Sequence, residues 1–276
     1  NDRVYPQKAD FTFYGGIYRD VSLLVVNKNH IALGHFGDTG VKITSDLKEG
    51  SADIQVETLV EGEGTVVVEL LDAEGNSVAR GEGEKTSLHL DAPHLWNGVK
   101  DPYLYTCIVR LMQDGKPVDE VTTKVGLRSF SVDAKKGFFL NGKPYPLHGV
   151  SRHQDRKGLG NAITREMHDE DMALIRELGA NTVRLAHYQH DQYFYDLCDK
   201  YGMVVWAEIP YISEHLPKGR ENTISQMKEL IHQNYNHPSI VCWGVSNEIT
   251  ISTKDKKDML DNHRQLNDLC HEMDKT

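Results

Sequence analysis

Polar side chains stand at or just after the ends of several short apolar runs in the second half of the chain. They are His148 and His153, Arg184 and His187, Glu208, and the pair Asn247-Glu248. Because the carboxyl ends of parallel strands meet at one edge of a sheet, where ligands bind, we expect these groups to line one site. Carboxylates, an amide and imidazoles together suit general acid–base chemistry on a polar, uncharged substrate.

Glu248 is the strongest candidate for a catalytic group. It follows the apolar run 240–245, which contains Trp243, and stands beside Asn247. A carboxyl group at the rim of a dry pocket would favour its protonated form, as a general acid requires. Asn247 can both donate and accept hydrogen bonds, which suits a sugar hydroxyl. One alternative stays open, in which Asn247 caps a helix and Glu248 interacts with the helix dipole.

The elements that must position these groups follow from hydrophobic periodicity. Upstream of about residue 130, alternating runs such as 53–60 and 105–111 predict about seven strands of an antiparallel sandwich. Downstream, helical stripes separate the apolar runs, which predicts four parallel β/α units. The downstream apolar runs are 145–150, 181–185, 203–207 and 240–245.

Three further local expectations concern single residues and one segment. Asp191 and Gly202 should cap the two ends of a helix. Trp96, beside a turn, should pack between the two halves of the chain. Residues 21–26 should form a strand without an earlier partner, as if they closed a preceding unit.

The composition excludes a membrane span and a nucleic-acid partner. The 276 residues are 39% hydrophobic and carry a net charge of −10 without a basic block. No apolar run approaches the ~20 residues that cross a bilayer. The four cysteines are widely spaced and match no zinc motif, so we expect free thiols and a cytoplasmic location.

Four blocks of the sequence resemble glycoside hydrolase family 2, the family of β-galactosidases, β-glucuronidases and β-mannosidases. They are NHPSIVCWGVSNE (236–248), NTVRLAHY (181–188), GGIYRDV (15–21) and DPYLY (101–105). The resemblance implies a multi-domain β plus α/β fold. Its parts would be the C-terminal strand segment of a sugar-binding jelly roll (1–26), an immunoglobulin-like β-sandwich (27–130), and the first four β/α units of a (β/α)8 TIM barrel (131–276).

The resemblance also implies roles for individual residues. Glu248 would be the acid/base that protonates the glycosidic oxygen and later activates water. Asn247, His187, His153 and Asp10 would bind the substrate. Arg184, Glu208 and Trp243 would support them.

The expected activity is that of a retaining exo-β-glycosidase acting on terminal non-reducing β-D-galactosides. The alternatives are a β-glucuronidase or β-mannosidase of the same family, or a non-catalytic carbohydrate-binding module. In this family the nucleophilic glutamate stands on a later strand than the four expected here, so we expect the chain alone to be inactive.

No cofactor is expected to be required, and β-galactoside sugars are the expected partners. Some relatives hold Mg²⁺ through a Glu-x-His motif, whereas this chain has Glu214-His215, so Mg²⁺ with Glu214 and Glu248 is left open rather than predicted. Because the outer strands of a four-stranded half-barrel are open edges, we expect a homo-oligomer.

Overall fold

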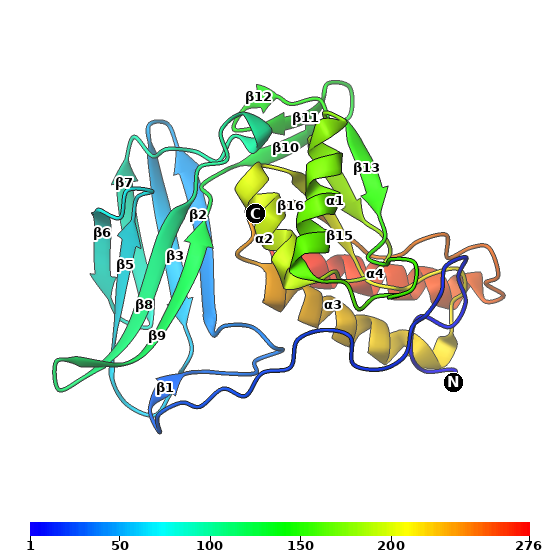
Figure 1. Cartoon of the computed structure of the whole chain (residues 1–276), viewed down its shortest axis with the longest axis horizontal. Coiled ribbons are helices and arrows are strands. Elements are labelled where there is room, and N and C mark those ends of the chain that lie inside the picture. Colours follow the sequence, from blue (N-terminus) through cyan, green and yellow to red (C-terminus); the bar gives the residue numbers. More distant parts are fainter.

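The computed structural model describes residues 1–276, in which a β-sandwich lies beside a parallel α/β unit (Figure 1). The sandwich has two antiparallel sheets, which confirm the predicted seven-stranded immunoglobulin-like arrangement. One has the order β2-β3-β7, from β2 (Val41–Lys48), β3 (Ser51–Thr58) and β7 (Lys85–Asp91). The other has the order β6-β5-β8-β9, from β5 (Thr65–Leu71), β6 (Ser77–Glu82), β8 (Tyr105–Gln113) and β9 (Lys116–Val125).

The sandwich core follows from strict alternation along its strands. Ile54 and Val56 of β3 are fully buried, at 0% exposed, while Gln55 between them is exposed. Val109 and Leu111 of β8 supply the facing layer of the same core. Alternate side chains of a strand point to opposite faces, so one face of each sheet is apolar and the other faces solvent.

The α/β unit is a four-stranded parallel sheet with the order β13-β14-β15-β16. Its strands are β13 (Gly149–Arg152), β14 (Thr182–Leu185), β15 (Val204–Glu208) and β16 (Ile240–Gly244). Its helices are α1 (Arg165–Glu177), α2 (Gln192–Tyr201), α3 (Arg220–Asn234) and α4 (Lys256–Met273). Strand and helix alternate four times, as the four β/α units of a partial TIM barrel require.

Short elements connect these units. Two short strands pair next to the sandwich, β1 (His30–Ile31) and β4 (Val60–Glu61). A small antiparallel sheet precedes the α/β unit, formed by β10 (Phe130–Asp133), β11 (Gly137–Leu140) and β12 (Lys143–Pro144). Two 3-10 turns complete the structure, η1 (Gly98–Lys100) and η2 (Pro217–Gly219).

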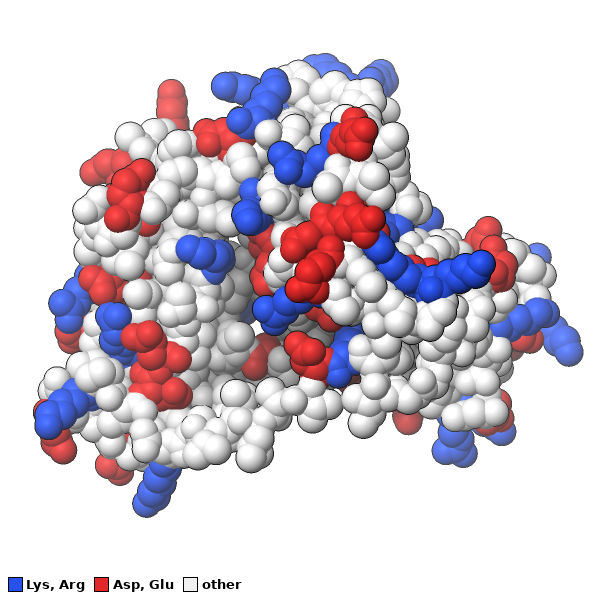
Figure 2. Space-filling view, viewed as in Figure 1, with Lys and Arg blue, Asp and Glu red and all other residues white.

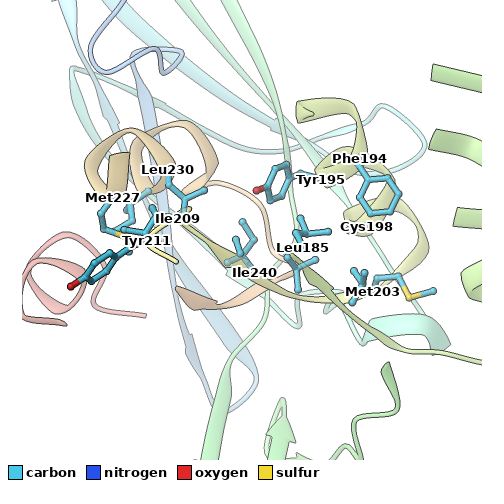
Figure 3. Packing of buried hydrophobic residues seen from close by; sticks show 14 of the residues in the cluster. Leu185, Phe194, Tyr195, Cys198, Met203, Ile209, Tyr211, Met227, Leu230 and Ile240 are labelled. Atoms are coloured by element: carbon cyan, nitrogen blue, oxygen red, sulfur yellow. The ribbon is translucent and has the colours of Figure 1, made fainter. Parts of the chain in front are cut away.

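The two faces of the parallel sheet differ in character, which decides where chemistry can occur. Leu185 of β14 and Ala207 of β15 are fully buried and pack with side chains of the helices. Figure 3 shows part of this cluster, including Phe194 of α2 and Met227 of α3. The opposite face carries polar and aromatic side chains, and Trp206 there is 42% exposed. This face corresponds to the interior of a barrel.

Capping residues set the ends of α2 as predicted. The side chain of Asp191 accepts a hydrogen bond from the backbone N–H of Tyr193 at 2.9 Å. Gly202 ends the helix in the left-handed conformation, with φ of 74°. A residue without Cβ adopts this conformation at little cost, so the chain can turn directly into β15.

The sandwich side and the barrel side meet at the end of α2. Trp96 is fully buried there, as expected from the sequence, and its indole N–H donates to the carbonyl of Asp199 at 2.9 Å. A Cβ on Gly202 would overlap the backbone of Gly98 and Val99 in η1. The two backbones can therefore lie this close only because residue 202 has no side chain.

The first parallel strand begins later than predicted. The apolar run 145–150 was expected to form it, whereas β13 begins at Gly149. Tyr145 instead packs with Trp96, and Pro146 has no backbone N–H for a strand ladder. His148 consequently lies before the strand, at its amino end, where its backbone N–H donates to Asn181. The expectation that His148 belongs to the site was wrong.

The predicted strand at residues 21–26 is absent. The N-terminal segment, blue in Figure 1, runs from the helices of the α/β unit to β1 without joining a sheet. Leu23 and Val25 are 89% and 88% exposed. Alternating apolar residues form a strand only when a neighbouring strand pairs with their backbone. The assignment of residues 1–26 to a jelly roll stays a prediction.

Charged side chains of both signs are mixed on the surface. Figure 2 shows Lys and Arg interspersed with Asp and Glu, and a hollow between the sandwich and the helices of the barrel. This hollow has a volume of about 710 Å³. None of the helices is both long enough and apolar enough to cross a bilayer.

A buried polar network fixes the end of β13. The guanidinium of Arg152, only 5% exposed, donates to Asp171 of α1 at 2.7 Å and to the Nδ1 atoms of His168 and His190 at 3.0 and 3.1 Å. Burial first, and then the charge of Arg152, lower the pKa of His168 to about 4. Both imidazoles therefore accept as neutral rings, and the network joins β13, α1 and the segment after β14.

We predict that Gly202→Ala destabilises the protein more than Gly179→Ala does. Both glycines have φ of 74°, but nothing lies within 4 Å of a Cβ on Gly179. Alanine at residue 179 should therefore lower the free energy of unfolding only by the ~1–2 kcal/mol of a left-handed residue. Alanine at residue 202 should lower it by about 1–3 kcal/mol more, because it also overpacks η1. Urea unfolding of both variants would measure the difference, and equal losses would contradict the close approach.

We predict that His168→Gln makes stability less dependent on pH. A histidine whose pKa is about 4 when folded, against 6.5 as its ordinary value, contributes stability that is complete above pH 6.5. That stability is lost as pH falls from about 6.5 towards 4. Between about pH 7 and pH 4.5 the wild type should lose more free energy of unfolding than His168→Gln in urea titrations. His271→Gln, at an exposed residue of α4, should match the wild type. Parallel curves for all three proteins would argue against the effect.

Candidate active site

The candidate site forms where β14 and β15 end, on the face that corresponds to the barrel interior. In the register of the sheet, Arg184 of β14 pairs with Trp206 of β15, and Glu208 of β15 pairs with Gly244 of β16. Since alternate residues share a face, Arg184, Trp206 and Glu208 all point away from the helices. The two-residue repeat of the strands thus places these three side chains on the same face of the sheet.

A two-point ion pair joins the first two strands of the site. Arg184 donates from Nε to Oε2 of Glu208 and from Nη2 to Oε1, both at 2.9 Å. The carboxylate of Glu208 is completely buried, and the guanidinium lies 5.1 Å from the ring centre of Trp206. The planar fork of arginine matches a carboxylate at two points, so this pair fixes both orientations.

Gly244 lets the third strand approach this pair closely. A Cβ at this residue would overlap the indole nitrogen of Trp206 and would lie 2.6 Å from Cβ of Glu208. Glu208 can therefore occupy its position only because residue 244 has no side chain.

His187 and Asn247 bond to the ion pair of Arg184 and Glu208, and we call these four residues the bonded set. Nδ1 of His187 lies 2.5 Å from Oε1 of Glu208, and Nη2 of Arg184 donates to Oδ1 of Asn247 at 2.8 Å. We assign the proton of His187 to Nδ1 because Glu208 can only accept there, which leaves Nε2 as an acceptor. The amide of Asn247 keeps its N–H groups for a ligand. The set therefore offers both an acceptor and donors to hydroxyl groups.

His153 stands beside this set, inside an aromatic cluster. Its ring centre lies 5.1 Å from that of His187 and 4.8 Å from that of Phe11. Tyr188 packs on the same cluster, 5.6 Å from Phe11. Burial, and then His187, lower the pKa of His153, while the exposed Asp10 acts in the opposite direction. Phe11, the residue after Asp10, thus brings the N-terminal segment against the predicted substrate-binding histidines.

Glu248 follows Asn247 and is exposed to solvent. We expected its carboxyl group at the rim of a dry pocket, but the residues of this chain do not bury it. Its backbone is left-handed, with φ of 49°. A non-glycine residue in this region costs about 1–3 kcal/mol and is often found at functional sites, where its surroundings impose the conformation. Here the imposing contacts are the backbone hydrogen bonds between Asn247 and the segment 211–213.

Trp243 lies on the opposite face of the sheet from the bonded set. It pairs with Ala207 in the register and packs with the cluster beneath the helices. Its indole N–H donates to Asp274, just after α4, at 2.8 Å. Although Trp243 is close to Glu248 in the sequence, its side chain points to the helix side of the sheet, because alternate residues of a strand face opposite sides.

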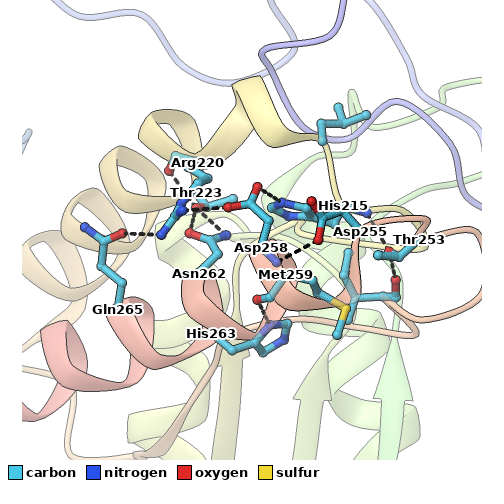
Figure 4. A network of polar contacts seen from close by, with 12 residues as sticks. His215, Arg220, Thr223, Thr253, Asp255, Asp258, Met259, Asn262, His263 and Gln265 are labelled. Atoms are coloured by element: carbon cyan, nitrogen blue, oxygen red, sulfur yellow. Dashed lines mark hydrogen bonds and ion pairs between the residues drawn. The ribbon is translucent and has the colours of Figure 1, made fainter.

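A second polar network, shown in Figure 4, anchors the segments after β15 and β16. His215 bonds Tyr211 through Nδ1 at 2.7 Å and Asp258 of α4 through Nε2 at 2.6 Å. Asp258 also accepts from Arg220 of α3 at 2.7 Å. The backbone N–H of His215 donates to Thr253. The segment that carries Asn247 and Glu248 is therefore linked to α3 and α4 through the buried His215.

The same network decides whether a Mg²⁺ ion fits beside the acid/base. Both ring nitrogens of His215 are already bonded within the protein, so this residue has no ligand atom to offer. Glu214 and Glu248 belong to neither of the clusters in which three ligating groups come together. The residues present do not fit the metal site of some relatives.

Sequence reasoning missed three contributors to this region. Trp206 could have been found, because it stands two residues before Glu208 on the same face of a strand. Phe11 and Asp258 had no local signal, since each reaches its partners across more than forty residues of chain.

Comparison with known protein families matches both halves of the chain. The model of the TIM barrel domain of glycosyl hydrolases family 2 matches residues 131–276. A further model of glycosyl hydrolases family 2 matches residues 35–128. The two matches follow each other in the order of the sandwich and the parallel sheet.

Individual relatives agree with these matches. A β-glucuronidase of Bacteroides fragilis is 42% identical over 271 residues, which cover 89% of this chain and 39% of that protein. A β-galactosidase of Thermoanaerobacter pseudethanolicus is 30% identical, covering 97% of this chain and 36% of that protein. The crystal structure of an FMN-binding β-glucuronidase from Facaelibacterium prausnitzii L2-6 superposes with a TM-score of 0.97 at 43% identity, covering 100% of this chain and 44% of that one.

The chain thus spans about two-fifths of the length of these relatives. Within that span, both domain matches follow the order of the sandwich and the parallel sheet. This chain belongs to glycosyl hydrolase family 2.

Proposed function

We propose that this chain forms part of a retaining exo-β-glycosidase that removes terminal β-glucuronides, with Glu248 as its acid/base. The observation that supports the proposal most is the bonded set of Arg184, Glu208, His187 and Asn247 at neighbouring strand ends. Glycosidases of this kind need a carboxyl group beside donors and acceptors for sugar hydroxyls. The set supplies those donors and acceptors, and Glu248 follows it directly.

Glu248 acts twice in the proposed mechanism. It protonates the glycosidic oxygen as the bond to the leaving group breaks, and it then takes a proton from the attacking water. Asn247 donates its amide N–H to the sugar 2-hydroxyl, because Arg184 already occupies its carbonyl oxygen. This contact strengthens as positive charge develops on the sugar ring in the transition state.

His187 and His153 bind the sugar ring through their imidazoles. Nε2 of His187 accepts from a ring hydroxyl, since Nδ1 donates to Glu208. His153 lies against His187, and Asp10 approaches from the N-terminal segment as a further acceptor. Arg184 and Glu208 do not bind the sugar in this scheme; they hold His187 and Asn247 in place.

The nucleophile of the retaining pair is proposed to lie outside the residues of this chain. A retaining pair needs a second carboxylate about 5–5.5 Å from the acid/base, free to attack the sugar. Glu208 is the carboxylate of the bonded set, but it is fully buried and bonded to Arg184 and His187. A carboxylate committed in this way is a poor nucleophile.

The substrate assignment departs from the β-galactoside favoured by the sequence. The Bacteroides fragilis relative, at 42% identity, is a β-glucuronidase, whereas the Thermoanaerobacter β-galactosidase is 30% identical. Structures of β-glucuronidases from Bacteroides uniformis also superpose on this chain, one of them with a TM-score of 0.91. These likenesses support the β-glucuronidase alternative better than the galactosidase.

Two further expectations stay predictions. They are homo-oligomeric assembly and a cytoplasmic location. The sheet order leaves β13 and β16 as the two outer strands, and this is the feature that supports self-association.

We predict that Glu248→Gln, made in the full-length enzyme, lowers the rate most for substrates with poor leaving groups. Alkyl glucuronides, which need protonation of the leaving oxygen, should lose about 10²–10⁴-fold in kcat/KM. Glucuronides of acidic phenols should lose much less at the same step, because their leaving groups depart as anions. Kinetics across a series of leaving groups would measure this dependence.

A second readout separates the acid/base role from general damage. Azide attacks without needing a base, so it should restore turnover of the phenol glucuronides in Glu248→Gln and yield a β-glucuronyl azide. Glu221→Gln, at an exposed residue of α3, should behave like the wild type without azide. Equal losses for every leaving group, without azide rescue, would refute the assigned role.

We predict that the full-length enzyme prefers a β-glucuronide to a β-galactoside with the same leaving group by at least about tenfold in kcat/KM, or ~1.4 kcal/mol. Paired assays with the two 4-methylumbelliferyl glycosides would measure this ratio. A ratio in favour of the galactoside would return the assignment to a β-galactosidase without affecting the role of Glu248.

A further inference from the structure

Three potential metal ligands meet where the sandwich side touches α3. The loop between β1 and β2 extends from the sandwich towards the helices (Figure 1), and its Phe36 carbonyl accepts from Gln233 of α3 at 2.8 Å. His35 and Asp38 of this loop come together with His232 of α3. One ligand atom from each lies within 4.8 Å of the other two.

The separation of two of these atoms fits a shared ion better than a hydrogen bond. Nδ1 of His232 lies 3.4 Å from Oδ2 of Asp38, beyond the ~2.7–3.2 Å of a good N–H···O bond. Two tetrahedral ligands, each ~2.0–2.1 Å from a Zn²⁺ ion, are separated by about 3.3 Å. The other carboxylate oxygen of Asp38 accepts from the backbone N–H of Gly40 at 2.9 Å. That bond orients Asp38 and leaves Oδ2 for an ion.

Phe36 holds both imidazoles in position. Its ring stacks on His232, with centres 4.8 Å apart and an angle of 9°, and it meets His35 edge-on at 5.2 Å. Its backbone is left-handed, with φ of 53°, so the loop bends sharply between His35 and Asp38. The three ligands are therefore arranged before any ion binds.

A second cluster shows what a satisfied ion pair looks like in the same protein. Asp199 bonds Nδ1 of His237 at 2.6 Å and the backbone N–H of Ser239 at 3.1 Å, so both its oxygens are used. The cluster of His35, Asp38 and His232 differs, because the distance from Nδ1 of His232 to Oδ2 of Asp38 is longer and this oxygen accepts no short hydrogen bond.

We propose that His35, Asp38 and His232 bind one Zn²⁺ ion that bridges the sandwich side and the barrel side. Two imidazoles and one carboxylate suit zinc, whereas Mg²⁺ and Ca²⁺ prefer sets made only of oxygen. Asp38 and His232 line both the hollow of about 710 Å³ and a smaller one of about 90 Å³, so water can reach a fourth position. The ion joins ligands separated by about two hundred residues and stabilises the contact between the loop and α3.

Calorimetric titration of the purified, tag-free protein with ZnCl2, after removal of metals by a chelator, tests the proposal. The wild type should bind one equivalent of zinc, with a rise in Tm. His232→Gln and Asp38→Asn should each weaken this binding by about tenfold or more. Asp38→Asn keeps an oxygen for the N–H of Gly40, so the loop should stay folded. His89→Gln, at a surface histidine that pairs with Asp53 at 2.6 Å, should bind zinc as the wild type does.

Cobalt substitution gives a readout that depends on the ligands themselves. Co²⁺ should give the visible absorption of a four-coordinate site in the wild type, and zinc should displace it. The proposal is overturned if the wild type binds no zinc, if both ligand variants bind it unchanged, or if Mg²⁺ competes at equal concentration. None of these outcomes depends on glycosidase activity, so the result is independent of the proposed function.

Discussion

The ion pair between Arg184 and Glu208 is the interaction on which the candidate site depends. A fully buried carboxylate without a partner would be strongly destabilising, and the two-point contact with Arg184 supplies that partner. The same guanidinium also reaches Asn247, and the same carboxylate also reaches His187. One charge pair thus sets the orientation of groups from three segments of the chain, and removing Arg184 would leave the charge of Glu208 buried without this partner.

The neighbouring strands and loops fix the position of the Arg184–Glu208 pair in the sheet. Gly244 lets β16 lie against it, and the Arg152 network secures β13 on the other side. The segment after β16 has no regular structure of its own, but its Thr253 accepts from the backbone N–H of His215, whose ring in turn bonds Asp258 of α4. Rigid strands and anchored loops together give the positional accuracy that catalytic groups require, since small displacements lower rates severely.

Much of the fold was predictable from the sequence, because single strands and helices carry their own signals. Alternation in β3 and β8 and the caps of α2 depend on neighbouring residues alone. The site residues on β14 and β15 were predictable for the same reason. The errors arose where partners decide the outcome: the segment 21–26 has no strand to pair with, and Trp243 is placed by the pleat rather than by its neighbour. Phe11 and Asp258 act on segments far away in the chain, which no local pattern reveals.

The contact between Gly202 and Gly98 has a consequence for how this protein can change over generations. The end of α2 belongs to the barrel and η1 to the sandwich, between β7 and β8, and the backbone of η1 leaves no room for a side chain on residue 202. A side chain at residue 202 can be accommodated only if the backbone of Gly98 and Val99 shifts as well. Exchange of the sandwich between relatives, by recombination or by engineering, would therefore have to carry both sides of the contact together. The contact thus couples the two domains at this point, even though each has its own hydrophobic core.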